Sequence, residues 1–212
     1  MQTCIVFCAG AFYGLAEAID ESDYIIAADG GLAHLNKLGL QAHCVLGDFD
    51  SLGYVPEDCL VFPVEKDDTD SMLAIRHGLN RGFRRFVLYG ALEGKRLDHA
   101  IANFQALQFL ADHGAVGYLP GADTMATLIQ NSTLTLPPRE RGIVSVFCMG
   151  ADAREVTIRG LQYGLEQGSL TAGMPLGVSN HFIGEKATIS VKSGSLLVLY
   201  PLEIGFGEVQ PC

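Results

Sequence analysis

The sequence predicts an α/β fold, a parallel sheet with helices on both faces, followed by a small all-β sandwich domain. In residues 1–132, short apolar runs alternate with segments of helical periodicity, which is typical of a parallel sheet covered by helices. In residues 133–212, short β-type runs follow one another between glycine-containing turns, and no helical pattern appears. We therefore expect two domains, with the boundary between residues 132 and 133.

The first domain is expected to contain five strands and three clear helices. The strands are predicted at residues 3–8, 24–28, 44–46, 60–64 and 86–89. The helices are predicted at residues 32–38, 69–81 and 97–112, the first of them ended by Gly39 and the last with Ile101, Phe104 and Leu107 on its apolar face. Leu15, Ala18 and Ile19 give a weaker helical pattern. In the second domain we expect strands at residues 143–148, 155–158, 187–191 and 196–199.

Composition and charge exclude several classes of function. The 212 residues carry a net charge of −10 without a run of Lys or Arg, which argues against a nucleic-acid partner. No apolar stretch is long enough to span a bilayer, so we expect no membrane partner. The six cysteines form no C-x-x-C pair and lie mostly in apolar runs, which indicates buried thiols in a reducing compartment and therefore a cytoplasmic protein.

Two acidic clusters stand out, one around Asp48 and Asp50 and one at residues 67–70. Side chains two residues apart in an extended segment project to the same side. Two carboxylates about 4 Å apart repel by roughly 4 kcal/mol at an effective dielectric constant of about 20. A hard divalent cation, completed by phosphate oxygens, is the natural neutraliser, so we predict a Mg²⁺–nucleotide site. The alternative is a pair of solvated turns, which Asp and Ser also favour.

Four polar segments follow the carboxyl ends of predicted strands, where open α/β sheets bind ligands. They are Asp29-Gly30-Gly31, the segment around Asp48, residues 66–70 and residues 90–98. Each also has a plain structural interpretation: a tight turn, an N-cap at Thr69, or a basic loop before a helix that begins near Asp98. We expect the four to converge on one crevice.

The order of these segments resembles that of the bacterial thiamine pyrophosphokinase family. The resemblance is carried by Asp29-Gly30-Gly31, Gly47-Asp48-Phe49-Asp50-Ser51, Lys66-Asp67-Asp68-Thr69-Asp70, the segment from Gly90 to Asn103, and Gly177-Val178-Ser179-Asn180. It implies an α/β nucleotide-binding catalytic domain and a thiamine-binding β-sandwich. It also implies a homodimer with thiamine bound where the subunits meet, and transfer of a diphosphoryl group from ATP to thiamine with Mg²⁺.

The resemblance also implies roles for individual residues. Those that would hold the metal are Asp48, Asp50 and Asp70, and Asp98 would act beside them in catalysis by positioning the substrates. Those that would bind nucleotide or phosphate are Asp29, Gly30, Gly31, Lys66, Asp67, Thr69, Arg96, His99 and Asn103. Those that would contact thiamine are Ser179 and Asn180. Whether Asp98 or Asp70 accepts the hydroxyl proton is left open.

The chain departs from the family pattern in two places. Gly94-Lys95 stands where two glycines are usual, and the chain has no Trp to stack on thiamine, for which His181 and Phe182 are the candidate replacements. Two other functions remain open. A diphosphokinase of a pterin alcohol would share the acidic clusters, and a non-catalytic Mg²⁺–nucleotide sensor would bind ATP without releasing AMP.

Overall fold

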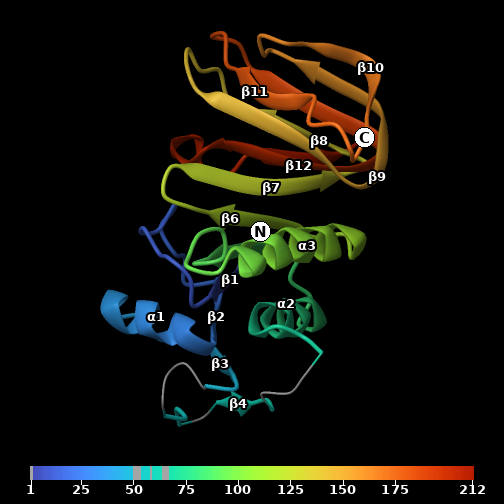
Figure 1. The fold of residues 1–212 in the computed structure, drawn as a ribbon. Coiled ribbons are helices and arrows are strands. Elements are labelled where there is room, and N and C mark those ends of the chain that lie inside the picture. The colour runs from blue at the N-terminus through green and yellow to red at the C-terminus, as the bar shows by residue number, and fades with distance from the viewer. Residues whose placement is uncertain (1, 50–53, 58, 64–66) are drawn as a thin grey trace. The chain divides into compact units, whose positions relative to one another are not determined.

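The computed structural model describes residues 2–49, 54–57, 59–63 and 67–212 (Figure 1). The chain divides into two compact units, Met1–Ala122 and Asp123–Cys212. The division falls before the boundary expected between residues 132 and 133. It does so because strand β7 (Thr124–Gln130) pairs along its whole length with β12 (Ala187–Pro201) of the second unit.

The first unit is built on a parallel sheet, as the sequence predicted. Its strands lie in the order β4-β3-β2-β1-β5-β6, and every pairing among them is parallel. Their bounds are β1 Cys4–Phe7, β2 Tyr24–Ala28, β3 Cys44–Gly47, β4 Leu60–Val61, β5 Arg85–Tyr89 and β6 Val116–Pro120. The central strands β1, β2 and β5 are buried almost throughout, which explains why they are apolar on both faces.

Three α-helices accompany this sheet in the described part of the first unit. They are α1 (Leu32–Leu38), α2 (Asp70–Asn80) and α3 (Leu97–Asp112). Helix α1 contacts β1 and β2, whereas α2 packs on β1–β3 and on α3. In Figure 1, α1 and α2 lie on opposite sides of β2 and β3. Right-handed crossovers require this arrangement, because the chain reverses direction across the sheet between β4 and β5.

That reversal creates a topological switch point between β1 and β5. From β1 the chain steps outward to β2, β3 and β4, and from β5 it steps the other way to β6. The loops after β1 and β5 are bonded across the switch point, since the N–H of Gly10 donates to the Gly90 carbonyl at 3.0 Å. Open α/β sheets bind ligands outside the carboxyl ends of strands at such a point.

Three expectations for the first unit were wrong or incomplete. The pattern at Leu15, Ala18 and Ile19 forms no helix, and Gly14 there has a φ of 116°, which a helix does not allow. Of the strand expected at residues 60–64, only Leu60 and Val61 are in β4, and residue 64 lies outside the described residues.

The apolar face expected for α3 was only partly right. Leu107 is buried as expected and Phe104 is half-buried, but Ile101 is 53% exposed, although it was placed on the core side. The buried stripe is formed by Asn103, Ala106, Leu107 and Leu110.

The second unit is built of β-strands, as expected, and its strand pairings are antiparallel. Its strands are β7, β8 (Ser132–Leu136), β9 (Ile143–Arg159), β10 (Leu165–Leu170), β11 (Gly177–His181), β12 and β13 (Glu208–Pro211). The two long strands β9 and β12 each replace two shorter predicted ones. Their first and second halves have different neighbours: one sheet is β11-β9-β12-β7 and the other is β10-β9-β12-β8-β13.

The strands pass from one sheet to the other at a shared corner. Gly150 in β9 and Gly194 in β12 have φ of 73° and 106°, and Asn131 between β7 and β8 has a φ of 49°. The N–H of Asn131 donates to the Gly194 carbonyl, so the bends lie together. Corners of this kind, made by strands that switch sheets, are a feature of β-sandwiches. The glycines that suggested strand ends in the sequence are therefore bends within strands.

No helix in the described part of the chain is long and apolar enough to cross a membrane. All six cysteines are free thiols, and burial raises the pKa of Cys4 and of Cys8 to about 12.

Candidate active site

Three carboxylates meet at the carboxyl edge of the first unit's sheet. Asp29, Asp48 and Asp70 each present an oxygen atom, and these three atoms lie within 4.8 Å of one another. Asp29 follows β2, Asp48 follows β3, and Asp70 is the first residue of α2. Three of the four segments that the sequence placed at strand ends therefore converge, as expected.

Backbone geometry brings Asp29 and Asp48 together. Asp29 begins a 3₁₀ turn (Asp29–Gly31) with a φ of 46° and is 7% exposed. Gly47 has a φ of 150°, and a Cβ atom there would lie 3.0 Å from the Cα of Asp29. Only glycine allows β3 to approach the end of β2 this closely.

The three carboxylates of the cluster repel one another, and a bound cation would offset this repulsion. At an effective dielectric constant of about 20, each pair of charges 4.8 Å apart repels by about 3.5 kcal/mol, so three pairs sum to roughly 10 kcal/mol before screening. Three converging carboxylate oxygens are the donor set that Mg²⁺ or Ca²⁺ prefers. The cluster also affects its neighbour, because the charge of Asp70 adds to burial in raising the pKa of Cys8.

Asp48 and Asp50 were expected to lie in an extended segment. The structure differs at Phe49, whose φ of 60° is left-handed and whose side chain is buried in the core, 3% exposed. Asp50 and Lys66 lie outside the described residues. Asp29, which the resemblance placed in the nucleotide pocket, is the third member of the cluster.

The residues of the second acidic segment, 67–70, have different environments. Asp68 forms an ion pair with Arg76 of α2 at 2.9 Å, so its carboxylate is directed along the helix. Asp67 is exposed. Thr69 is the N-cap of α2, and its hydroxyl accepts a hydrogen bond from the N–H of Met72 at 3.3 Å.

A chain of hydrogen bonds holds the start of α2 against α3. The Ser71 hydroxyl lies 3.0 Å from that of Thr69 and donates to Oδ1 of Asn103 at 3.0 Å. The Asn103 amide donates in turn to the Ala91 carbonyl at 2.7 Å. Asn103 is only 6% exposed, so it joins α2, α3 and the loop after β5 rather than facing solvent. Through Ser71 it also fixes the neighbouring Asp70.

The loop after β5 carries the basic residues. Arg96 and Asp98 are bonded to each other at 2.6 Å, and both are exposed. The Arg96 guanidinium lowers the pKa of Asp98 to about 2. Asp98 lies in the first turn of α3 without capping it, and His99 beside it is exposed.

Gly30 and Gly31, which the resemblance placed in nucleotide binding, lie in the turn that follows β2. A Cβ on Gly31 would lie 1.8 Å from the Phe7 carbonyl oxygen. Gly31 is therefore required for packing of the turn on β1, whereas Gly30 is partly exposed beside it.

In the second unit, Ser179 and Asn180 have different environments. Ser179 is exposed, with a φ of 58°. Asn180 is 4% exposed, and its side chain accepts a hydrogen bond from the N–H of Tyr163 at 2.9 Å and donates to the Tyr163 carbonyl at 2.7 Å. Tyr163 is 62% exposed, whereas Phe182 is 4% exposed. Tyr163 was not singled out from the sequence, because the residue that holds its backbone, Asn180, is distant in the sequence.

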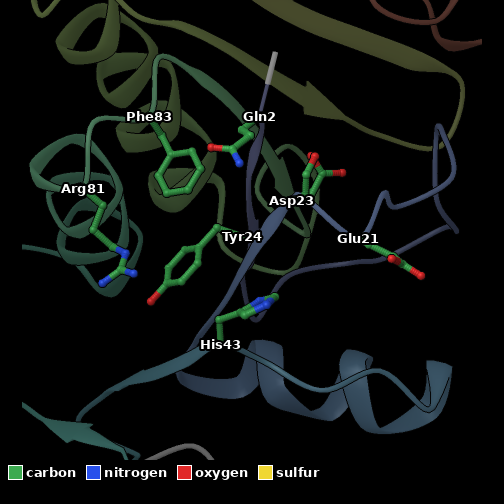
Figure 2. Close-up of a pocket in the computed structure, with 8 residues that line it drawn as sticks. Gln2, Glu21, Asp23, Tyr24, His43, Arg81 and Phe83 are labelled. Carbon is green, nitrogen blue, oxygen red and sulfur yellow. The ribbon is translucent and has the colours of Figure 1, made fainter.

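A separate hollow of about 570 Å³ lies beside the amino-terminal ends of β1–β3 (Figure 2). It is lined by Gln2, Glu21, Ser22, Asp23, Tyr24, His43, Arg81 and Phe83. The Tyr24 ring stacks on His43 and Phe83 and lies 4.4 Å below the Arg81 guanidinium. Among the described residues, none of those expected in the site lines this hollow. We therefore place the candidate active site at the acidic edge, at the carboxyl ends of the strands.

Comparison with known families identifies both units. Residues 15–116 match the thiamin pyrophosphokinase catalytic domain, and residues 131–196 match the thiamin pyrophosphokinase vitamin B1 binding domain. The chain belongs to the thiamin pyrophosphokinase family. The acidic cluster falls in the part matched to the catalytic domain, and Tyr163, Ser179 and Asn180 fall in the part matched to the B1 binding domain.

Individual thiamin pyrophosphokinases are similar over most of the chain. The thiamine pyrophosphokinase of Bacillus subtilis is 27% identical over 196 residues, which cover 85% of this chain and 88% of that protein. A crystal structure of the Geobacillus thermodenitrificans enzyme has a TM-score of 0.79 at 26% identity, covering 95% and 97% of the two chains. The yeast structure, at 13% identity and a TM-score of 0.70 over 94% and 86% of the two chains, shares the fold.

Proposed function

We propose that the protein transfers the diphosphoryl group of ATP to the hydroxyl of thiamine, giving thiamine diphosphate and AMP. The observation that carries this proposal is the convergence of Asp29, Asp48 and Asp70 at the carboxyl edge of a sheet, in a chain whose two units match the two domains of one enzyme family. The match to a B1 binding domain favours thiamine over a pterin alcohol.

The proposed metal is Mg²⁺, held by Asp29, Asp48 and Asp70. The fit rests on donor chemistry: three carboxylate oxygens within 4.8 Å of one another suit a hard divalent ion. When bound, the ion would neutralise charge on the phosphate oxygens. Asp50 remains a further expected ligand from the resemblance. The Ser71–Asn103 hydrogen bond would keep Asp70 in place while substrate enters.

The remaining groups around the cluster would bind and orient the triphosphate. Arg96 would exchange its bond to Asp98 for phosphate oxygens, or bind both, and Lys66 and Lys95 would add point charges. The low pKa of Asp98 makes it a weak base. We therefore propose that the residues act by positioning and electrostatics, with no strong base, as a loose phosphoryl-transfer transition state permits.

For thiamine we propose Tyr163 as the aromatic residue that takes the place of the missing Trp. Two observations support this proposal. The Tyr163 side chain is exposed, and Asn180 holds its backbone by hydrogen bonds to both the N–H and the carbonyl. Asn180 would then act through Tyr163, and the exposed Ser179 would contact the ligand. Phe182 is too deeply buried for stacking on a ligand.

We also propose that the enzyme is a homodimer. Among the described strands, β11 pairs only with β9, so its other edge has no neighbouring strand. Three large apolar side chains in β11 or in the segment just before it are exposed. They are Met174 (64%), Leu176 (64%) and Val178 (41%). An exposed apolar edge strand favours association. Light scattering of the Leu176→Asp variant would show monomer if this edge forms the contact, and unchanged dimer if it does not.

The function is tested by incubating the purified protein with ATP, Mg²⁺ and thiamine, and separately with a pterin alcohol. We expect AMP and thiamine diphosphate in the first reaction and neither AMP nor a diphosphorylated product in the second. AMP formation with only the pterin alcohol would establish the alternative substrate. Nucleotide binding without AMP under thiamine saturation would identify a sensor instead of an enzyme.

A further inference from the structure

Glu93 is an acidic residue in the loop that should approach the phosphates. It lies between the end of β5 and the basic residues Lys95 and Arg96. A carboxylate directed toward a polyphosphate would weaken its binding, so the orientation of this side chain matters. The structure directs it elsewhere: Oε1 of Glu93 accepts a hydrogen bond from the N–H of Ala122 at 3.0 Å.

Ala122 is the last residue of the first unit, immediately before the segment that continues into the second. The main chain of Glu93 is held as well, because its carbonyl accepts a hydrogen bond from the N–H of Ala11 at 2.8 Å. A single residue thus joins the loop after β1, the loop after β5 and the segment after β6. The first two of these loops flank the switch point beside the acidic cluster.

The contact between Glu93 and Ala122 requires a residue without a side chain at position 121, which is Gly121. A Cβ atom on Gly121 would lie 2.4 Å from Oε1 of Glu93 and 2.9 Å from Cδ2 of Leu92. Both atoms are the ends of flexible side chains, so an alanine here would displace the Glu93 carboxylate rather than the backbone. The absence of a side chain at residue 121 leaves the space that the carboxylate uses.

We propose that Glu93 is a positioning residue that fixes the phosphate-binding loop, residues 90–96, to the segment at residues 121–122. The inference rests on the proposed function for the role of this loop. Fixing the loop keeps Arg96 in place for the incoming triphosphate and keeps the negative charge of Glu93 directed away from it. Loss of the contact therefore affects binding of Mg²⁺–ATP more than the chemical step.

The test compares Glu93→Ala, Glu93→Gln and Gly121→Ala, with Gly173→Ala as the control because a Cβ at Gly173 meets no atom within 4 Å. We expect Glu93→Ala to raise KM for Mg²⁺–ATP about tenfold, with kcat within about twofold, as the loss of a hydrogen bond to a charged group permits. Glu93→Gln should stay within about threefold, because its amide oxygen still accepts from Ala122.

Non-additivity provides the sharper readout. If Gly121→Ala acts by displacing Glu93, it should raise KM like Glu93→Ala, and the double variant should be no worse than either single variant. Thermal unfolding should change little in all of them. A general loss of structure would instead lower Tm and lower kcat, without a selective rise in KM. Equal impairment by Gln and Ala, or fully additive effects, would overturn the proposal.

Hydrogen exchange separates this proposal from the proposed function. In Glu93→Ala, the amides of Ala11, of Ala122 and of residues 90–96 should exchange faster than in the unaltered protein. This expectation holds whether or not the unaltered protein makes AMP. Unchanged exchange at these amides would refute the contact's positioning role. A protein that makes no AMP but shows faster exchange in the variant would refute the activity and retain the positioning role.

Discussion

The substitution Asp29→Asn removes one charge from the acidic cluster without changing the shape of the side chain. Asn accepts the left-handed backbone conformation at least as well as Asp, so the φ of 46° adds no strain. The substitution should therefore separate the electrostatics of the cluster from its packing.

The expected magnitude follows from the geometry of the cluster. Asp29 takes part in two of the three carboxylate pairs, each of which repels by about 3.5 kcal/mol at 4.8 Å, or about 7 kcal/mol before screening. Asp48 and Asp70 are partly exposed, and solvent and counterions reduce this figure, so we expect a net gain on the order of 1–2 kcal/mol without metal. For a protein of this size, this corresponds to a Tm increase of about 2–8 °C.

The assay is thermal unfolding of both proteins in EDTA and in a series of Mg²⁺ concentrations. In EDTA the Asp29→Asn protein should unfold at the higher temperature. Mg²⁺ should raise the Tm of the unaltered protein by binding its folded state and should raise that of the variant much less. The control is Asp123→Asn, which removes the same charge from an exposed position outside the cluster.

Two results would refute this reasoning. One is a lower Tm for Asp29→Asn in EDTA, which would mean that the carboxylates stabilise the fold without a cation. The other is an equal response of both proteins to Mg²⁺, which would remove Asp29 from the metal site.

Three further predictions concern single residues. Replacing Asn103 with Ala leaves the Ala91 carbonyl and Ser71 without their buried partner. The free energy of unfolding, measured in urea, should therefore fall by about 2–3 kcal/mol. A fall of less than about 0.5 kcal/mol, the size of an ordinary surface change, would contradict the network. Arg96→Gln should return the pKa of Asp98 from about 2 toward its ordinary 3.8 in a carboxyl NMR titration. Because the folded-state pKa of Asp98 is the lower one, the ion pair's contribution to stability is present above about pH 4 and is lost as the pH falls toward 2. An unchanged pKa of Asp98 in the variant would show that the ion pair does not form. Tyr163→Ala should raise KM for thiamine about tenfold while Tyr163→Phe does not, since stacking needs only the ring; an equal effect of both would point to the hydroxyl.

Regular elements with local signals could be predicted from the sequence. Helix α3 was expected at residues 97–112 and is found at those bounds, and α1 ends at Gly39 as expected. Both depend on periodicity and end signals contained in the segment itself. On α3, Leu107 was placed correctly, but Ile101 was expected in the core because it is large and apolar. Asn103 is buried in its place, where it bonds to Ser71 and Ala91.

The candidate site was predictable in outline and not in detail. The rule that ligands bind at the carboxyl ends of parallel strands placed Asp29, Asp48 and Asp70 at one edge. The choice of cluster members depended on backbone conformation, such as the left-handed φ of Phe49 and the close approach at Gly47, which no local pattern specifies. The same is true of Tyr163, which is fixed by Asn180 seventeen residues later.

The same limit applies to the long strands of the second unit. Gly150 and Gly194 suggested strand ends, because glycine weakens an isolated strand. In the folded unit their positive φ angles allow β9 and β12 to bend from one sheet into the other. Only the pairing of several strands at one corner reveals this role.

The central claim, diphosphoryl transfer to thiamine, is tested most directly with ATP labelled at the γ-phosphorus. Incubation with the protein, Mg²⁺ and thiamine should transfer the label into thiamine diphosphate and leave the AMP unlabelled, because the β- and γ-phosphoryl groups move together. Labelled thiamine monophosphate with ADP, or labelled orthophosphate without a thiamine product, would contradict the account.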